Sequence, residues 1–165
     1  TSGNNCTTTG LKMKQLTIAF DIYMAGVLDS DGSISIDKRL RQTTTRGYQY
    51  REQEQLTLKR EPGTERLLNE IKERYGGSIC VFKNGGFHRN GEYVKYTASG
   101  KAVEKLLTAV IPYMRLKKPQ AEYALAMRGM KNSGWGGGRN KPDDWQESED
   151  AIYKAMQKQK ARGRE

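Results

Sequence analysis

The feature that most constrains this chain is an apolar stretch that gives way abruptly to strict two-residue alternation. From Leu16 to Leu28, apolar residues recur at broadly helical spacing. The polar segment Asp29-Ser30-Asp31-Gly32 then predicts the end of the helix, and Ser33 to Asp37 alternates as a half-buried strand does. Gly26 lies in the middle of the predicted helix, where glycine is unfavourable by roughly 1 kcal/mol relative to alanine. We therefore expect another helix to approach this segment closely.

The remainder of the chain alternates hairpins with helices. The predicted elements are a strand at 48–60, a helix at 62–75, a hairpin with strands 78–83 and 93–98, and helices at 101–110 and 119–130. This order predicts an α+β domain over residues 15–132, in which one antiparallel four-stranded sheet carries helices on one face. We expect residues 1–14 to form a disordered polar tail, residues 133–142 a glycine-rich linker, and residues 143–165 an extra C-terminal helix.

Alternation divides the predicted sheet into two faces. Ile34, Ile36 and Leu40 are expected to face the core, together with Leu56 and Leu58 of the next strand. The opposite face is polar and basic. It is either a solvated sheet surface or a surface that contacts a groove of nucleic acid.

The charge balance favours nucleic acid. The chain has 29 lysine and arginine residues against 19 aspartate and glutamate residues, a formal net charge of +10. Such an excess is typical of proteins with a polyanionic partner. Two cysteines are too few for a disulfide framework or a cysteine-based zinc site, and a single histidine argues against a zinc hydrolase and a Ser-His-Asp hydrolase. Because neither a membrane span nor a signal peptide is recognisable, we expect an intracellular protein, in the cytoplasm of a prokaryote with its nucleoid or inside an organelle, with no membrane partner.

One short motif is more specific than the composition. The residues Met24-Ala25-Gly26-Val27-Leu28-Asp29-Ser30-Asp31-Gly32 resemble the nine-residue signature of the LAGLIDADG homing endonucleases, with Met24 and Ser30 as the visible departures. The predicted αββαββα order is the core fold of that family. The resemblance implies that the Asp31 carboxylate and the main-chain carbonyl of Ser30 bind a divalent cation, and oxygen ligands favour Mg²⁺. Asp29 is expected to bond backbone groups at the helix junction instead.

The chain contains one copy of the motif, although cutting a duplex requires attack on two strands. The resemblance implies a homodimer in which the motif helices of two subunits pack against each other across a two-fold axis. Ala25 and Gly26 are small residues that would fit such an interface. A two-fold protein in turn implies a palindromic or nearly palindromic site in double-stranded DNA.

Two further positions correspond to the family's catalytic pocket. The segment from Pro112 to Ala121 resembles a family segment whose lysine, here Lys117, lies near the scissile phosphate and can stabilise developing charge or help to activate water. Pro119 replaces a usual lysine, and by itself the pair of lysines would indicate only a charged run before a helix. At the end of the second predicted strand, Arg60 stands where the family commonly has glutamine, with Glu61 beside it. Both are therefore candidates for the pocket, although their chemistry differs from that of the glutamine that is common in the family.

The exposed sheet face is the predicted DNA-binding surface. Arginine suits guanine, glutamine suits adenine and aspartate can accept from cytosine, so these residue types can read bases as well as bind phosphates. The candidates on the first hairpin are Ser35, Asp37, Arg39, Arg41, Arg51, Gln53, Gln55 and Thr57, and those on the second are Lys83, Arg89 and Lys95.

The resemblance implies a Mg²⁺-dependent endonuclease that makes double-strand breaks in a long pseudo-palindromic site and so promotes the copying of a mobile intron. One alternative is an RNA maturase of the same fold, with intron RNA as its partner. Asp31, Lys117 and the single motif argue against that alternative, because maturases with this motif commonly carry two copies. A non-catalytic nucleic-acid-binding module is the other alternative.

Overall fold

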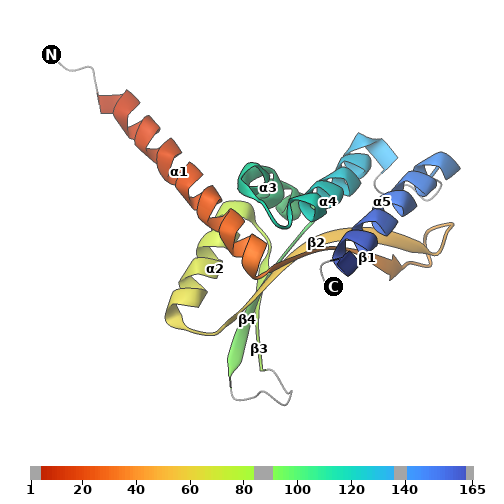
Figure 1. Ribbon diagram of the computed structural model, residues 1–165, viewed down its shortest axis with the longest axis horizontal. Coiled ribbons are helices and arrows are strands. Elements are labelled where there is room, and N and C mark those ends of the chain that lie inside the picture. Colours follow the sequence, from red (N-terminus) through yellow and green to blue (C-terminus); the bar gives the residue numbers. More distant parts are fainter. Residues whose placement is uncertain (1–4, 84–90, 136–140, 163–165) are drawn as a thin grey trace.

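The computed structural model describes residues 5–83, 91–135 and 141–162 (Figure 1). The elements are α1 (Asn5–Ser30), β1 (Gly32–Leu40), β2 (Tyr48–Lys59), α2 (Pro62–Tyr75), β3 (Ser78–Lys83), β4 (Glu92–Ser99), α3 (Lys101–Val110), a short 3₁₀ helix (Ile111–Tyr113), α4 (Lys118–Met130), a π-helical turn (Lys131–Trp135) and α5 (Asp143–Arg162). The predicted α+β class, the αββαββα order and the extra C-terminal helix are confirmed.

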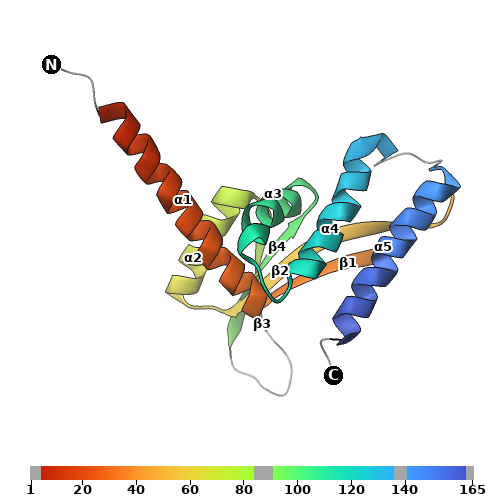
Figure 2. The same ribbon diagram turned by 45° about the horizontal axis from the view of Figure 1, so that its top comes forward.

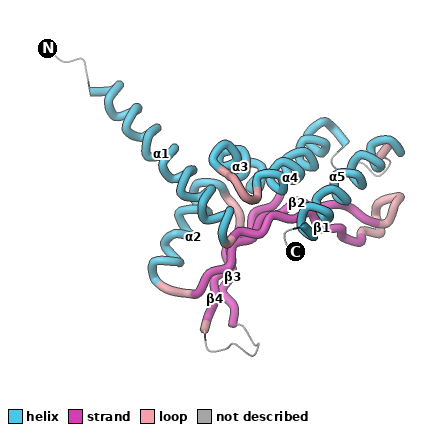
Figure 3. Tube along the Cα trace, viewed as in Figure 1, coloured by secondary structure: helices cyan, strands magenta, loops and turns pink. Residues whose placement is uncertain are grey.

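The four strands form one antiparallel sheet in the order β1-β2-β4-β3. All five α-helices lie on one side of this sheet (Figures 1 and 3). In the central pairing of β2 with β4, Gln53 lies opposite Ser99 and Lys59 lies opposite Tyr93. No helix of the described residues lies on the other face of the sheet.

The core lies between the sheet and the helices. Ile34, Ile36 and Leu56 are almost fully buried, as the alternation predicts, and Leu58 is partly buried. Leu40 was placed in this core, but its side chain is 92% exposed. It is the last residue of β1, beside the turn to β2, at the end of the strand that lies far from the core.

Helix α1 begins at Asn5, so residues 5–14 are helical rather than part of a disordered tail. The helix projects beyond the rest of the molecule at its N-terminal end (Figure 2). Its middle is anchored on α2, because Arg74 Nη2 donates to Thr17 O at 2.8 Å and to Asp21 Oδ1 at 3.0 Å. None of the described helices combines the length and apolar character needed to cross a lipid bilayer.

Two sides of α1 are apolar. Met24, Ala25 and Leu28 are buried in the core of the same chain, whereas Ile22 and Tyr23 are about half exposed. The prediction that Ala25 lies between subunits is therefore wrong: its small side chain packs within its own chain and is 1% exposed. A helix that is apolar on opposite sides needs a second partner to cover the outer side.

Helix α5 belongs to the same core. Met156 is fully buried, and the Tyr153 ring stacks on Tyr50 of β2 with ring centroids 4.8 Å apart. Asp150 accepts hydrogen bonds from the Tyr48 and Tyr50 hydroxyls. These contacts fix α5 against the end of the first hairpin that lies far from the motif.

Candidate functional site

The site is built where α1 ends and β1 begins, at the motif junction Asp29–Gly32. Gly32 is fully buried, and a Cβ atom on it would lie 2.8 Å from both the Cα and the carbonyl oxygen of Leu28. Only glycine permits this close turn from helix to strand. The turn leaves Asp31 exposed, with a hydrogen bond from Ser30 Oγ to its Oδ2 at 3.1 Å.

Asp29 fixes the segment that carries Lys117. Its carboxylate accepts three backbone hydrogen bonds, from Arg115 N at 2.7 Å, Leu116 N at 3.2 Å and Lys117 N at 3.0 Å. Burial alone would raise the pKa of this carboxyl, but the three amide donors and the charge of Lys117 leave it below its usual value. The prediction of a structural role for Asp29 is confirmed, and the partner segment is now identified.

The Lys117 side chain returns to the same junction. Its Nζ donates to the carbonyl oxygens of Leu28 at 3.0 Å, Ser30 at 3.0 Å and Gly32 at 2.6 Å. Partial burial lowers the pKa of Lys117, and the charges of Asp29, Asp31 and Glu54 oppose that shift. The structure thus brings together Asp31, Ser30 and Lys117, although Ser30 and Lys117 are 87 positions apart in the sequence.

Arg60 and Glu61 lie outside this cluster. The Arg60 guanidinium is exposed and donates to the carboxylates of Glu65 on α2 and Glu92 on β4, and both raise its pKa. Glu61 precedes α2, where its carbonyl accepts from the amide of Glu65. Among the described residues, neither side chain makes a hydrogen bond or ion pair with Asp31, Ser30 or Lys117.

The motif junction offers oxygen donors for a hard divalent cation. The Asp31 carboxylate is accessible, and the Ser30 carbonyl already faces a cationic group, the Lys117 ammonium. Such donors suit Mg²⁺. In the described ranges, no group of three or more His, Cys, Asp or Glu residues could hold a metal ion by itself.

Most predicted DNA contacts lie on the sheet face that the helices leave open. Strand register and alternation place Ser35, Asp37, Arg39, Arg51, Gln53, Gln55, Thr57 and Lys95 on this outer face, and Arg41 joins it by donating to Gln49. Gln53 Nε2 donates to Asp37 Oδ2 at 2.5 Å, and Arg39 lies 3.7 Å from the same carboxylate. These three side chains therefore form one polar group before any ligand binds.

One predicted residue of the second hairpin, Lys83, does not lie on the outer face. Lys83 pairs with Glu92, which places it on the same side as Val94 and Tyr96 and therefore on the helix-side face. Phe82 instead occupies the outward position, where Lys95 Nζ lies 5.5 Å from its ring centroid. Arg89 lies outside the described residues.

Two buried acids on β2 were not predicted. Glu52 and Glu54 occupy inward positions, and their side chains are 1% and 0% exposed. Glu52 is neutralised by ion pairs with Arg128 and Lys131. Neither Glu54 carboxylate oxygen has a hydrogen bond of standard geometry within the described chain. The sequence did contain a signal for their position. Glu52, Glu54 and Leu56 are spaced two residues apart on one strand, so the inward position of Leu56 places both acids on the core side.

Comparison with known proteins points to one family. A sequence family described as LAGLIDADG endonuclease matches residues 24–126, which include the motif junction and Lys117. Among curated protein sequences, none matches this chain.

Solved structures share the fold at low identity. The homing endonuclease I-CvuI, in complex with its target in the presence of 2 mM Ca, has 22% identity and a TM-score of 0.57 over 69% of this chain and 68% of its own. Another I-CvuI complex, in 2 mM Mg with uncleaved DNA, has 20% identity and a TM-score of 0.57 over 73% and 72% of the two chains. The archaeal intron-encoded homing endonuclease I-Vdi141I, complexed with DNA, has 18% identity and a TM-score of 0.64 over 84% and 82%.

Proposed function

Because this chain belongs to the LAGLIDADG endonuclease family, we propose that it is a homing endonuclease that cuts both strands of a long pseudo-palindromic DNA site and so promotes intron mobility. The observation that carries the proposal is the meeting of Asp31 and Lys117 at the motif junction, beside a polar and basic sheet face. The similar structures with DNA bound support double-stranded DNA, rather than intron RNA, as the ligand. Its site of action is then wherever that DNA lies, in a nucleoid or an organelle.

In this proposal the cation is Mg²⁺, held by the Asp31 carboxylate and the Ser30 carbonyl. A bound divalent cation supplies stabilisation of the attacking and leaving oxygens in phosphodiester hydrolysis. Lys117 holds its positive charge beside this position and stabilises the charge that develops on the phosphate. Asp29 acts indirectly, by holding the backbone of residues 115–117 in place. Arg60 and Glu61 stay candidates only for contacts with DNA near the pocket.

The first test is cleavage of a randomised duplex library. In Mg²⁺ we expect one long, near-palindromic sequence to be cut in both strands, with 5′-phosphate and 3′-hydroxyl ends identified by sequencing. Removing the metal with EDTA should abolish the product without preventing DNA binding. Binding without cleavage in Mg²⁺ would instead identify a nucleic-acid-binding module.

We propose further that two copies of the chain form the active unit. Ile22, Tyr23 and Gly26 lie on the outer side of α1, and a Cβ atom added to Gly26 would meet nothing within 4 Å in its own chain. This apolar side runs down to Ser30 and Asp31, so pairing two α1 helices would bring two motif junctions together. Two junctions match the two strands of a duplex.

Tyr23→Lys is therefore expected to convert a dimer into a monomer. A lysine there places a charge in the proposed interface, while the tyrosine side chain makes little use of its own chain's core, being 51% exposed. Sedimentation velocity at micromolar concentration would measure the change. Met13→Lys also replaces an exposed apolar side chain of α1 by a charged one, but on another side of the helix. It should leave the dimer intact. A wild-type protein that is monomeric both in the absence of DNA and when bound to DNA would contradict this assignment.

A further inference from the structure

A cavity of about 480 Å³ lies beside the end of β2 that is far from the motif junction. Strand β2 pairs with β4 only from Gln53 onward, so residues 48–52 form an edge without a strand partner on that side. The cavity is lined by this edge, by the turn from β1 to β2, and by residues of α4 and α5. We call it the edge cavity.

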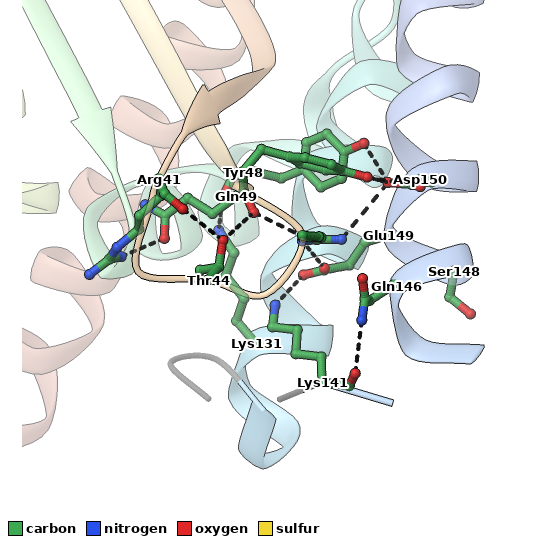
Figure 4. A network of polar contacts seen from close by, with 12 residues as sticks. Arg41, Thr44, Tyr48, Gln49, Lys131, Lys141, Gln146, Ser148, Glu149 and Asp150 are labelled. Atoms are coloured by element: carbon green, nitrogen blue, oxygen red, sulfur yellow. Dashed lines mark hydrogen bonds and ion pairs between the residues drawn. The ribbon is translucent and has the colours of Figure 1, made fainter. Parts of the chain in front are cut away.

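The backbone of this edge is already occupied. Lys131 Nζ donates to Tyr50 O at 2.8 Å, and Arg46 Nε and Thr44 Oγ1 donate to Tyr48 O at 3.1 and 3.2 Å. Figure 4 shows Thr44 on the turn that joins β1 to β2 and Lys131 beside this turn. Because side chains already occupy the carbonyls of Tyr48 and Tyr50, we expect side chains rather than the strand backbone to recognise a ligand in the edge cavity.

The charged side chains that line the edge cavity are mostly cationic. Four of the cations face carboxylates: Glu149 binds Arg46 and Lys141, and Glu52 binds Arg128 and Lys131. The lining contains one acidic residue, Glu52, and six basic ones: Arg41, Arg46, Arg51, Arg128, Lys131 and Lys141.

The remaining two arginines are not neutralised within the described chain. Arg41 donates to Thr43 Oγ1 and Gln49 Oε1, and Arg51 donates to Ser99 Oγ at 2.7 Å, so both contact only neutral acceptors. The edge cavity therefore carries a positive excess on the side formed by the outer sheet face. An anion is the ligand that this excess attracts.

Two unsatisfied donor groups point to the same kind of ligand. Arg46 has a side chain only 10% exposed, yet its buried Nη1 has no hydrogen bond and lies 3.8 Å from Oδ1 of Asp150. Helix α3 begins at the cavity, with Gly100 at its N-cap and no side chain capping its first amides. A buried guanidinium nitrogen and an uncapped helix N-terminus both favour a phosphate group.

We propose that the edge cavity receives a phosphate of the DNA backbone, where the duplex bound on the outer sheet face passes the edge of β2. This inference rests on the proposed function, because it needs DNA on that face. Arg41 and Arg51 belong to the predicted DNA surface and also line the cavity, so the two regions are continuous. Lys131 and Lys141 line the edge cavity from the helix side, where each is paired with a glutamate.

Gln146→Glu tests this proposal without altering the sheet face. Gln146 lines the edge cavity in the first turn of α5, where its Nε2 donates to Lys141 O and where a negative charge also suits the helix dipole. We expect the variant to bind a random-sequence 40-base-pair duplex about tenfold more weakly in EDTA at low salt. Gln157→Glu, the same change at an exposed position on α5, should bind as wild type does. Equal losses in both variants, or none, would overturn the proposal.

Two further measurements identify the source of the phosphate. Arg51→Gln should reduce the slope of log affinity against log salt by about one, as loss of one phosphate contact does. In NMR spectra, the backbone amides of residues 100–103 should shift on adding DNA and also on adding pyrophosphate. Shifts with pyrophosphate but not with DNA would show a free-anion site and overturn the DNA assignment. Because every readout is binding, a protein that binds this way and never cuts would overturn only the nuclease proposal.

Discussion

Asparagine in place of Asp31 is expected to reduce the rate of DNA cleavage at least about 10³-fold while leaving the fold and DNA affinity close to wild type. The amide has nearly the same shape but lacks the negative charge that holds a divalent cation. The Asp31 side chain is exposed, and its one hydrogen bond from within the described chain comes from the neighbouring Ser30 hydroxyl. Its removal therefore breaks no contact that holds the core together.

Single-turnover cleavage of the sequence recovered from the library would measure this effect, with binding and thermal unfolding followed on the same preparations. Glu70→Gln is a suitable control, because it removes a carboxylate charge from an exposed position on α2. That control should cut at the wild-type rate. An Asp31→Asn protein that still cuts within tenfold of wild type would rule out Asp31 as the metal ligand.

The helices were predictable where their signals are local. The predicted bounds of α2 and α3 match the structure, since Pro62 and Gly76 delimit the first and apolar periodicity defines the second. The start of α1 was missed by about ten residues, because residues 5–15 are polar and carry no apolar period. Residues 5–15 extend the helix from the segment that Arg74 of α2 anchors.

The site residues that lie in short sequence motifs were predictable. Asp31 and Lys117 lie in two compact segments, and the role of Asp29 in joining them needed the fold. The face of Lys83 depends on a register set across the second hairpin, so composition alone placed it wrongly. Arg60 likewise meets Glu92, a partner on another strand that no local pattern reveals.

The buried acid Glu54 is expected to make the protein less stable as pH rises. Burial raises the pKa of this carboxyl from 4.5 to about 8, although the charge of Lys117 and the Ser33 backbone amide act in the other direction. Below about pH 4.5 the group is protonated in both states, so no ionisation penalty exists. Between the two pKa values the unfolded chain releases the proton and the folded chain keeps it, which destabilises the fold. By pH 8 this penalty amounts to roughly 4 kcal/mol.

Glu54→Leu should therefore be more stable than wild type, by an amount that grows from pH 5 to pH 8 and then levels off. At pH 8 the melting temperature should rise by about 10 °C. Glu52→Leu provides the matched contrast, because Glu52 is equally buried on the same strand but is paired with Arg128 and Lys131. Removing it leaves two cations without their carboxylate and should destabilise the protein at every pH in this range. If urea unfolding gives the Glu54→Leu protein no pH-dependent advantage, the carboxylate has partners in solution that neutralise its burial. The opposite outcomes expected for two neighbouring glutamates follow from pairing alone, since burial, strand and sheet face are the same for both.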